Sequence, residues 1–177
     1  STHEALAQIN RRIVSCRKCP RLVRYREEVA RTRRRAFRDW TYWGRPVPGF
    51  GDSEAELLIL GLAPAAHGGN RTGRVFTGDR SGDFLFRALH RAGFANQPTS
   101  THREDGLALR NAYVAAAVRC APPGNKPLPG EIRNCRPYLE AECDVLRPRA
   151  VLALGKIAFD AYLALLRERG ALANRGA

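Results

Sequence analysis

Methionine is absent from this sequence, and no apolar run in it approaches the length that a membrane span needs. A transmembrane helix takes about 20 mostly apolar residues, so we expect a protein that is not embedded in a membrane. The N-terminal segment also lacks the basic stretch, apolar stretch and cleavage site of a secretory signal. Hydrophobic residues still make up 44% of the 177 residues, which is too many for a disordered chain. These features favour one soluble domain of the cell interior.

Lysine is scarce as well, with only Lys18, Lys126 and Lys156 among 30 basic residues. The others are arginines, and with 17 acidic residues the formal net charge is +13. Because a planar guanidinium donates two hydrogen bonds to one phosphate, nucleic acid is the leading candidate partner. A basic surface that only maintains solubility is the alternative. Eight arginines lie between residues 21 and 38, where they form either a solvated helix face or a surface for the DNA backbone.

The five cysteines do not form the even set that a disulfide framework requires. Two residues separate Cys16 from Cys19, so both thiolates can reach one metal centre, and Cys120 and Cys135 follow much later in the chain. Four thiolates suit a zinc ion or an iron–sulfur cluster. The wide gap between the last two fits a zinc ribbon poorly and a cluster better, with free core cysteines as the alternative. Cys143 is left over, and its apolar neighbours predict a buried, inert thiol.

Three apolar segments predict the strands of a sheet. Leu57–Leu62 is a continuous apolar run, typical of a parallel strand that is buried on both faces, and residues 112–118 and 150–154 are the other two segments. Helical patterns separate them. This alternation predicts an α/β fold of three layers, α/β/α, with a central and mostly parallel sheet. We expect a single domain over residues 1–177, with a helical extension at 1–40 that carries the first cysteine pair.

The helices follow from apolar spacing and from capping residues. Ser1 and Glu4 resemble a capping box at the start of the first helix. Another helix is expected to begin at about Asp83, and two more lie around residues 130–146 and over 156–169. The side chains that the helix near Asp83 is expected to turn inward are Phe84, Leu85, Phe86, Leu89 and Phe94.

Two loops follow the expected strands at their carboxyl ends, the edge at which open α/β sheets bind ligands. Residues 63–74 are rich in glycine, which lets the backbone approach a ligand closely. Residues 121–127 are rich in proline and contain Asn125, so we expect them to be neither helix nor strand. These two loops are therefore the predicted site.

The loops carry motifs of a known family. The string GLAPAAHGGNRTGR at residues 61–74, followed by FTGD at 76–79, resembles the first signature of the iron–sulfur uracil-DNA glycosylases. The GLAPA form is similar to the family 5 branch, also called type B, and the resemblance covers residues 6 to about 166. Further matches in the same order are the first cysteine pair, RCAPP at 119–123, NKP at 125–127 and Cys135.

The resemblance implies a uracil-DNA glycosylase-like fold and a DNA repair enzyme. Such an enzyme flips uracil, and other deaminated bases such as hypoxanthine, out of duplex DNA and hydrolyses the N-glycosidic bond, which starts base excision repair. It acts as a monomer, in the cytoplasm of a bacterium or archaeon and in association with the nucleoid. The resemblance also implies a structural [4Fe-4S] cluster, with Cys16, Cys19, Cys120 and Cys135 as its ligands.

The resemblance further implies which residues hold the flipped base. Phe76 would be the stacking platform, Asn125 would hydrogen-bond the pyrimidine edge, and the backbone N–H groups of Leu62 and Ala63 would donate to the departing uracil. Phe76 as a core side chain and Asn125 as a turn former are the alternatives. The expected base-binding residues are Gly61, Leu62, Ala63, Ala65, Phe76 and Asn125.

Related branches carry an acidic residue at the position of Leu62, so another carboxylate has to serve the sugar cation and the water. Asp79 is the first candidate, because it ends the FTGD motif that faces the same loop. Asp83 is the rival, although its place before an apolar helix is typical of an N-cap, and a capping role is the alternative for Asp79 as well. We expect Asp79 and Asn125 to be the catalytic residues. We expect His67 and Arg71 to contact DNA phosphates.

The sequence departs from the superfamily at its end. No His-Pro-Ser occurs in it, although glycosylases of this superfamily carry a late loop of this type that contacts the cation and wedges the DNA. A fourth strand is not expected either, so we interpret the sequence as part of a longer protein. Two other functions stay open: a noncatalytic, cluster-stabilised DNA-binding module, and a zinc-containing hydrolase of a small phosphate ester.

Overall fold

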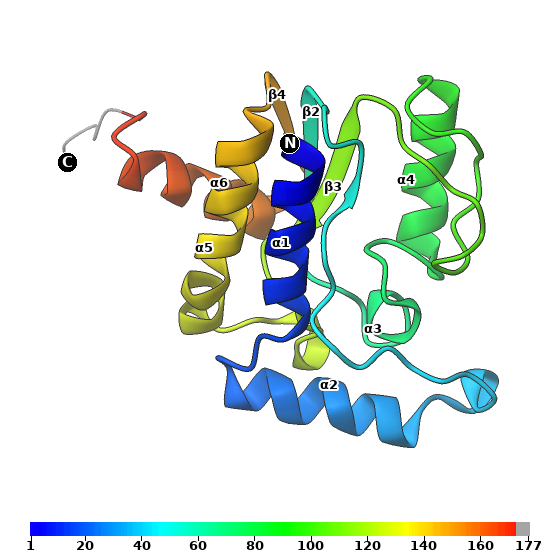
Figure 1. The fold of residues 1–177 in the computed structure, drawn as a ribbon. Coiled ribbons are helices and arrows are strands. Elements are labelled where there is room, and N and C mark those ends of the chain that lie inside the picture. The colour runs from blue at the N-terminus through cyan, green and yellow to red at the C-terminus, as the bar shows by residue number, and fades with distance from the viewer. Residues whose placement is uncertain (173–177) are drawn as a thin grey trace.

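The computed structural model describes residues 1–172 and shows a sheet of four strands in the order β1-β3-β2-β4 (Figure 1). The strand β2 (Leu57–Gly61) lies between β3 (Ala112–Ala116) and β4 (Ala150–Ala153) and is parallel to both. These three strands confirm the predicted mostly parallel sheet. The segment after Leu172 lies outside the described residues, and with it the expectation about the end of the chain.

The fourth strand of this sheet was not predicted. It is β1 (Phe50–Gly51), which runs antiparallel to β3 and pairs Phe50 with Val114. A strand of two residues has no apolar alternation, so the sequence pattern contains no signal for it. The main chain of this strand lies close to β3, because a Cβ on Gly51 would lie 2.4 Å from the Ala112 carbonyl oxygen.

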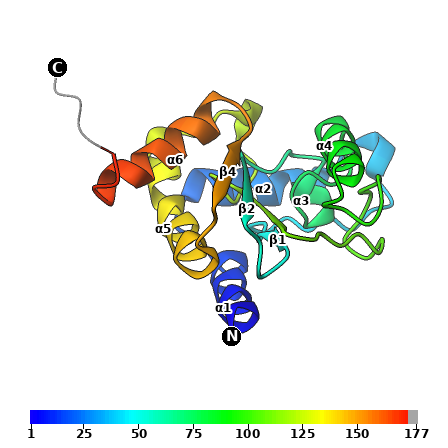
Figure 2. The same ribbon diagram turned by 90° about the horizontal axis from the view of Figure 1, so that it is seen from above.

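Helices cover both faces of the sheet, which confirms the α/β/α architecture. Figure 2 shows α1 (Thr2–Val14), α5 (Pro129–Leu146) and α6 (Lys156–Glu168) on one side and α4 (Arg80–Arg91) on the other. Because side chains alternate along a strand, Leu58 and Leu60 pack towards the first group of helices. The residues of the opposite core include Ile59, Val114, Leu85 and Phe86.

The helix after the glycine-rich loop begins earlier than predicted. Asp79 is the N-cap of α4, since its Oδ1 accepts a hydrogen bond from the Gly82 N–H at 2.8 Å. Asp83 lies exposed in the first turn. The helical period places Gly82, Leu85, Phe86 and Leu89 on one buried stripe, and Phe84 points outward with 75% of its surface exposed. The predicted inward direction of Phe84 is therefore wrong.

Two short turns interrupt the segments that were expected to be loops. The helix α3 (Gly69–Thr72) lies inside the glycine-rich loop, and a 3-10 turn, η2 (Pro123–Asn125), lies inside the proline-rich one. The expectation that 121–127 forms no helix is corrected by this single turn. The long helix α5 continues through Pro137 as one element.

The helix α2 (Pro20–Thr32) and the 3-10 turn η1 (Arg35–Phe37) form the rest of the N-terminal region. In Figure 1, α2 lies across the end of the sheet from which α3 emerges. Leu22 and Val23 are buried side chains of this helix. Among residues 1–172, no helix is long and apolar enough to cross a bilayer.

Candidate active site and cysteine group

A cavity of about 410 Å³ lies at the carboxyl edge of the sheet, between the loops that follow β2 and β3. Three chain segments form its walls: the glycine-rich loop with the start of α4, the turn η2, and the α2–η1 region. The residues that line it are Tyr25, Arg34, Phe37, Ala65, Ala66, His67, Gly68, Gly78, Asp79, Arg80, Pro122, Gly124 and Asn125. Four of the predicted site residues are thus brought together, namely Ala65, His67, Asp79 and Asn125.

The two carboxylate oxygens of Asp79 face different segments: Oδ1 faces the start of α4, and Oδ2 faces the glycine-rich loop. Oδ1 caps α4, as described above, and Oδ2 lies against Gly68, where a Cβ would stand only 2.3 Å from it. Gly68 is therefore required for the close approach of the loop backbone to this carboxylate. The capping role that the sequence left open for Asp79 is present, and Oδ2 remains directed towards the cavity-lining loop.

Asn125 reaches the same cavity from the other loop. Its backbone φ is 56°, in the left-handed region that asparagine tolerates better than most residues. The backbone N–H donates to the Pro122 carbonyl at 3.2 Å, whereas the exposed side-chain amide has no hydrogen bond to another described residue. This amide is free to donate and accept across the edge of a bound base.

Phe76 has a backbone conformation that is rare for an aromatic residue. Its φ is 50°, and holding a bulky residue there costs on the order of 1–3 kcal/mol. The ring lies on Gly61, because a Cβ at Gly61 would stand 2.3 Å from Phe76 Cζ. The Phe76 carbonyl in turn lies on Gly82, whose added Cβ would be 1.8 Å from that oxygen. Strain of this kind concentrates at functional sites.

The structure does not place every predicted base-binding residue on the cavity wall. Phe76 and Gly61 contact each other, but neither lines the cavity, and nor do Leu62 and Ala63. The Leu62 carbonyl accepts from Val118 N–H at 3.0 Å, and Ala63 packs against the buried cysteine group.

His67 is a half-buried residue of the cavity wall. Its Nδ1 lies 2.7 Å from the hydroxyl of Tyr42, which in turn accepts from Arg34 N–H at 3.2 Å. Burial, and then the positive charges of Arg34 and Arg71, lower the pKa of His67 below its ordinary value. The imidazole is therefore neutral at neutral pH.

Arg71 lies inside the protein and not on its surface, with 4% of its area exposed. Its Nε donates to the His67 carbonyl at 2.6 Å and its Nη2 to the Gly78 carbonyl at 2.8 Å. The guanidinium also lies 3.8 Å from the ring centroid of Phe37 and 4.2 Å from that of Trp40. In this arrangement Arg71 joins the two ends of the loop, because its donors are used within the chain.

The contribution of the α2–η1 region to the cavity was not anticipated. Arg34, Tyr25 and Phe37 all line it, although the sequence showed only a run of arginines there. Arg34 and Arg80 are exposed and come from opposite walls. The arginine-rich composition was the available signal, but nothing local indicates which loop such a segment will face.

Cys16, Cys19, Cys120 and Cys135 line one small cavity between the N-terminal region and the sheet. Asn134 Nδ2 donates to Cys19 Sγ at 3.3 Å. Burial raises the pKa of Cys120 to about 12 and that of Cys135 to about 11. Such thiols become thiolates only where a cation offsets the charge, as a coordinated metal does.

The four thiols can be compared with the ligands that a zinc ion or an iron–sulfur cluster requires. Within residues 1–172, no three histidine, cysteine or acidic side chains converge closely enough to hold a single metal ion, as a tetrahedral zinc site requires. Two buried arginines stand beside the thiols, Arg26 next to Cys120 and Arg119 next to Cys135. The Nε of each is buried with no hydrogen-bond partner. Arg119 also pairs with Glu142 through both Nη atoms. The four thiols that line one space fit the all-cysteine donor set of an iron–sulfur cluster.

Cys143 is separate from this group. It is buried between α5 and the sheet among apolar side chains, as predicted, and burial raises its pKa to about 11. It is therefore a protonated core thiol.

The fold and the site define a three-layer α/β protein with a cavity at the carboxyl edge of its sheet. Comparisons with known proteins agree with this class. A profile of the uracil DNA glycosylase superfamily matches residues 48–176. The Type-5 uracil-DNA glycosylase of Thermus thermophilus is 56% identical over 153 residues, covering 86% of this chain and 69% of that protein. The chain belongs to the uracil DNA glycosylase superfamily and to its type-5 branch.

Two further relatives show how much of such a protein the chain spans. The Type-5 uracil-DNA glycosylase of Pyrobaculum aerophilum is 50% identical over 165 residues, 93% of this chain and 72% of the relative. That of Mycobacterium bovis is 55% identical over 168 residues, 94% of this chain. The match covers only 63% of the mycobacterial protein, so the chain spans less than two thirds of its length.

Proposed function

We propose that this protein releases uracil from DNA by hydrolysing the N-glycosidic bond. The observation that carries the proposal is the cavity in which Asp79 and Asn125, from two loops far apart in the sequence, face one space. The type-5 relatives are named uracil-DNA glycosylases, which supports the proposal. A base has to leave the duplex stack before such a cavity can receive it.

Recognition of the base would combine stacking and hydrogen bonds. The free amide of Asn125 is the donor and acceptor for the pyrimidine edge, and the ring of Phe76, held over Gly61, is the stacking surface. Hydrogen bonds to a flipped base and stacking against an aromatic ring are the two interactions that such enzymes use. Deaminated purines such as hypoxanthine share the carbonyl edge, so we include them among the substrates.

Cleavage leaves negative charge on the departing base and positive charge on the sugar. Backbone N–H groups of Leu62 and Ala63 would donate to the base, as in an oxyanion hole. Asp79 Oδ2 is the negative charge closest to the glycine-rich loop, and it would stabilise the sugar cation and orient the attacking water. Leucine at position 62 contributes no charge to either step, so we assign both to Asp79.

Binding to duplex DNA would use the basic side chains around the cavity. Arg34 and Arg80 are exposed on opposite walls, and the arginines of residues 21–38 continue the positive surface. Arg71 would act indirectly by holding the His67 carbonyl. Each phosphate contact makes binding more sensitive to salt, so affinity that stays flat between 50 and about 200 mM salt would reject this surface.

We also propose that Cys16, Cys19, Cys120 and Cys135 hold a [4Fe-4S] cluster. When bound, the cluster supplies a covalent link between the N-terminal region and the loop after β3. Arg26 beside Cys120 and Arg119 beside Cys135 would offset part of its charge. Iron and sulfide content together with absorbance near 400 nm tests this assignment, and stoichiometric zinc in the purified protein would overturn it.

Release of free uracil from a duplex that contains one uracil tests the main proposal. We expect release from this duplex, and none from the same duplex with thymine at that position. A panel with hypoxanthine and other deaminated bases measures the breadth of the activity. DNA binding without release of any base would contradict the proposal and favour the noncatalytic DNA-binding module.

A further inference from the structure

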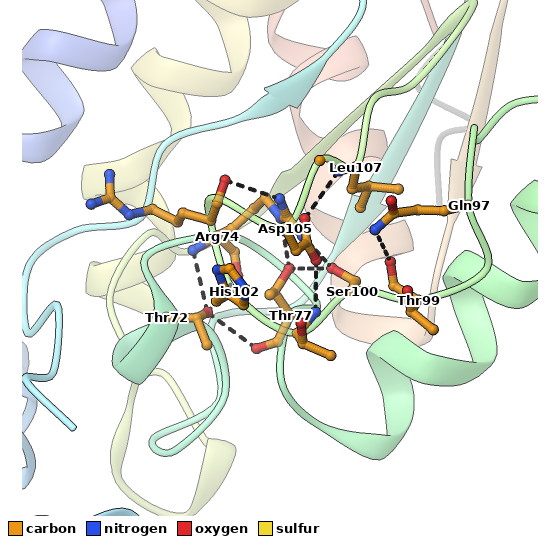
Figure 3. Close-up of polar contacts among 12 residues, drawn as sticks. Thr72, Arg74, Thr77, Gln97, Thr99, Ser100, His102, Asp105 and Leu107 are labelled. Atoms are coloured by element: carbon orange, nitrogen blue, oxygen red, sulfur yellow. Dashed lines mark hydrogen bonds and ion pairs between the residues drawn. The ribbon is translucent and has the colours of Figure 1, made fainter. Parts of the chain in front are cut away.

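One buried polar network of the protein takes no part in the chemistry proposed above (Figure 3). Its centre is Arg74, which is 3% exposed. Arg74 Nη2 donates to both carboxylate oxygens of Asp105, at 3.0 and 2.9 Å, and to Ser100 Oγ at 2.8 Å. Its Nε donates to Thr77 Oγ1 at 3.0 Å. The network thus joins the turn at 74–78 to the loop at 99–107.

Both carboxylate oxygens of Asp105 accept hydrogen bonds. Besides Arg74, the backbone N–H groups of Thr101 and Leu107 donate to its carboxylate at 2.9 and 3.0 Å. Burial by itself would raise the pKa of Asp105, but the hydrogen bonds from Arg74, Leu107 and Thr101 lower it to about 2. The carboxylate is therefore ionised at all pH values at which the protein works.

The network holds backbone groups before and after Phe76. On the N-terminal side, Thr77 Oγ1 lies 3.0 Å from the Val75 carbonyl, to which it can donate. On the C-terminal side, the Gly78 N–H donates to the Ser100 carbonyl at 3.0 Å. Thr77 Oγ1 and Ser100 Oγ are also 2.7 Å apart. Phe76, in its strained left-handed conformation, is the residue between these anchors.

A purely stabilising role is a poor explanation for this arrangement. A buried ion pair contributes little net stability compared with well-packed apolar side chains. The two segments that it joins are loops, and neither belongs to the sheet. The hydrogen bonds from Arg74 Nη2 to both Asp105 oxygens and from its Nε to Thr77 instead fix the orientation of the turn at 74–78. Phe76, at φ 50°, needs that orientation if its ring is to stay on Gly61.

We propose that Arg74, Asp105, Ser100 and Thr77 form a positioning network for Phe76. The network keeps the ring in the place where an extrahelical base stacks, so that stacking does not require the turn to reorganise. Arg74 and Asp105 are positioning residues, because neither lines the cavity. This inference rests on the proposed function, since it assigns a purpose to the Phe76 platform.

The test is a double-mutant cycle with single-turnover excision as the readout. We expect Asp105→Asn to slow excision about 10- to 100-fold, because small displacements of catalytic groups have effects of this size. Affinity for DNA should change less than about twofold, since no phosphate contact is lost. In a Phe76→Ala background, Asp105→Asn should add less than about a twofold effect, because the two act as a unit. Equal effects in both backgrounds would overturn the proposal.

Two substitutions at Thr77 and one at Asn96 are the matched controls. Thr77→Ser keeps the hydroxyl and should excise within about twofold of the parent, whereas the isosteric Thr77→Val should resemble Asp105→Asn. Asn96 ties the far end of the same loop through Ala108 N–H and the Gly106 carbonyl. Asn96→Ala should loosen that end and leave excision unchanged.

Hydrogen exchange distinguishes a failure of the positioning network from a failure of the proposed glycosylase function. The amides of residues 75–78 should exchange faster in Asp105→Asn and at the parent rate in Asn96→Ala. An unmutated protein that releases no base rejects the glycosylase proposal alone, and the exchange result then decides the positioning role. Unchanged exchange at 75–78 in Asp105→Asn would refute it in either case.

Discussion

The loop after β2 and the loop after β3 both reach the candidate cavity, but different interactions hold them. In the first loop, Arg71, Thr72, Arg74 and Asp79 all bond to neighbouring backbone or side chains. In the second loop, residues 121–127, Arg21 Nη2 bonds to the Lys126 carbonyl, and the side chains otherwise make few polar contacts. Its anchors are instead prolines and the cysteines on either side of it.

This difference indicates that the positions of the two loops depend on different interactions. The loop after β2 is rigid through its own polar contacts, which keep Phe76 strained and Asp79 fixed. The loop after β3 directly follows Cys120, and Cys135 lies beyond it on α5. If a cluster joins these thiols to Cys16 and Cys19, removing it should affect Asn125 much more than Asp79.

Loss of one cysteine ligand is expected to have the largest effect. Cys120→Ser should lower the thermal midpoint by more than about 10 °C, because structural metal sites contribute directly to folding. Cys143→Ala is the control, since it removes a core thiol away from the group, and it should cost less than about 5 °C. Calorimetry with iron analysis measures both. Equal losses in the two variants would mean that the loop after β3 does not depend on the cysteines.

The two candidate catalytic residues should separate activity from stability. Asn125→Gly, which suits the positive φ, and Asp79→Asn, which keeps a capping side chain, should each slow excision about 100- to 1,000-fold without loss of stability. Asp79→Ala should lose about 1 kcal/mol of stability in addition, because the cap of α4 is gone. Single-turnover kinetics and urea unfolding measure these effects. Asp83→Asn is the control, and an equal loss of excision in it would reject Asp79.

A glycine in each loop tests how tightly the loop is packed. Gly68→Ala would place a Cβ 2.3 Å from Asp79 Oδ2, and we expect a loss of about 1–3 kcal/mol together with slower excision. Gly124 has φ 60° but nothing within 4 Å of an added Cβ. Gly124→Ala should therefore cost only about 1 kcal/mol, from backbone strain. The comparison of the two loops is wrong if Gly124→Ala is the more damaging variant in urea unfolding.

The smallest expected effect is a pH dependence that belongs to the first loop alone. The pKa of Asp105 is about 2 in the folded protein and about 3.9 in an unfolded chain. Its ionised form therefore stabilises the fold above about pH 4, and this contribution disappears as the pH falls towards 2. The difference in unfolding free energy between the parent and Asp105→Asn should be constant from pH 7 to 5 and shrink below pH 4. About half of the pH-dependent difference should remain at pH 3, and a difference that is undiminished at pH 2 would contradict the assignment.

Much of the fold was predictable, because its signals are local. The apolar run at 57–62 predicts a buried strand from its composition, and the alternation of strands with helices predicts the layers. The two-residue strand β1 has no periodic pattern, so it had no signal. Phe84 was placed inward together with Leu85 and Phe86, although three successive helical positions do not share one face. The helical spacing buries Gly82, Leu85, Phe86 and Leu89 instead.

The sequence predicted which residues belong to the candidate site better than it predicted how they are arranged. The motifs identified Asp79, Asn125 and the four cysteines. They did not show that Arg71 is buried between two aromatic rings, since a charged residue in a glycine-rich loop is usually exposed. The entry of Arg34 into the cavity wall was also invisible, because it depends on how α2 crosses the end of the sheet.

By itself, the sequence determined the three parallel strands, most of the long helices, the family and the residue types of the candidate site. Each of these follows from neighbours along the chain or from a contiguous motif. Only the tertiary structure decided which of those residues share a space. Asp79 and Asn125 meet at one cavity, while Phe76 lies on Gly61 and is held from behind by Arg74 and Asp105. The reason is physical: these contacts join segments dozens of residues apart, and their geometry exists only once the sheet and its loops have packed.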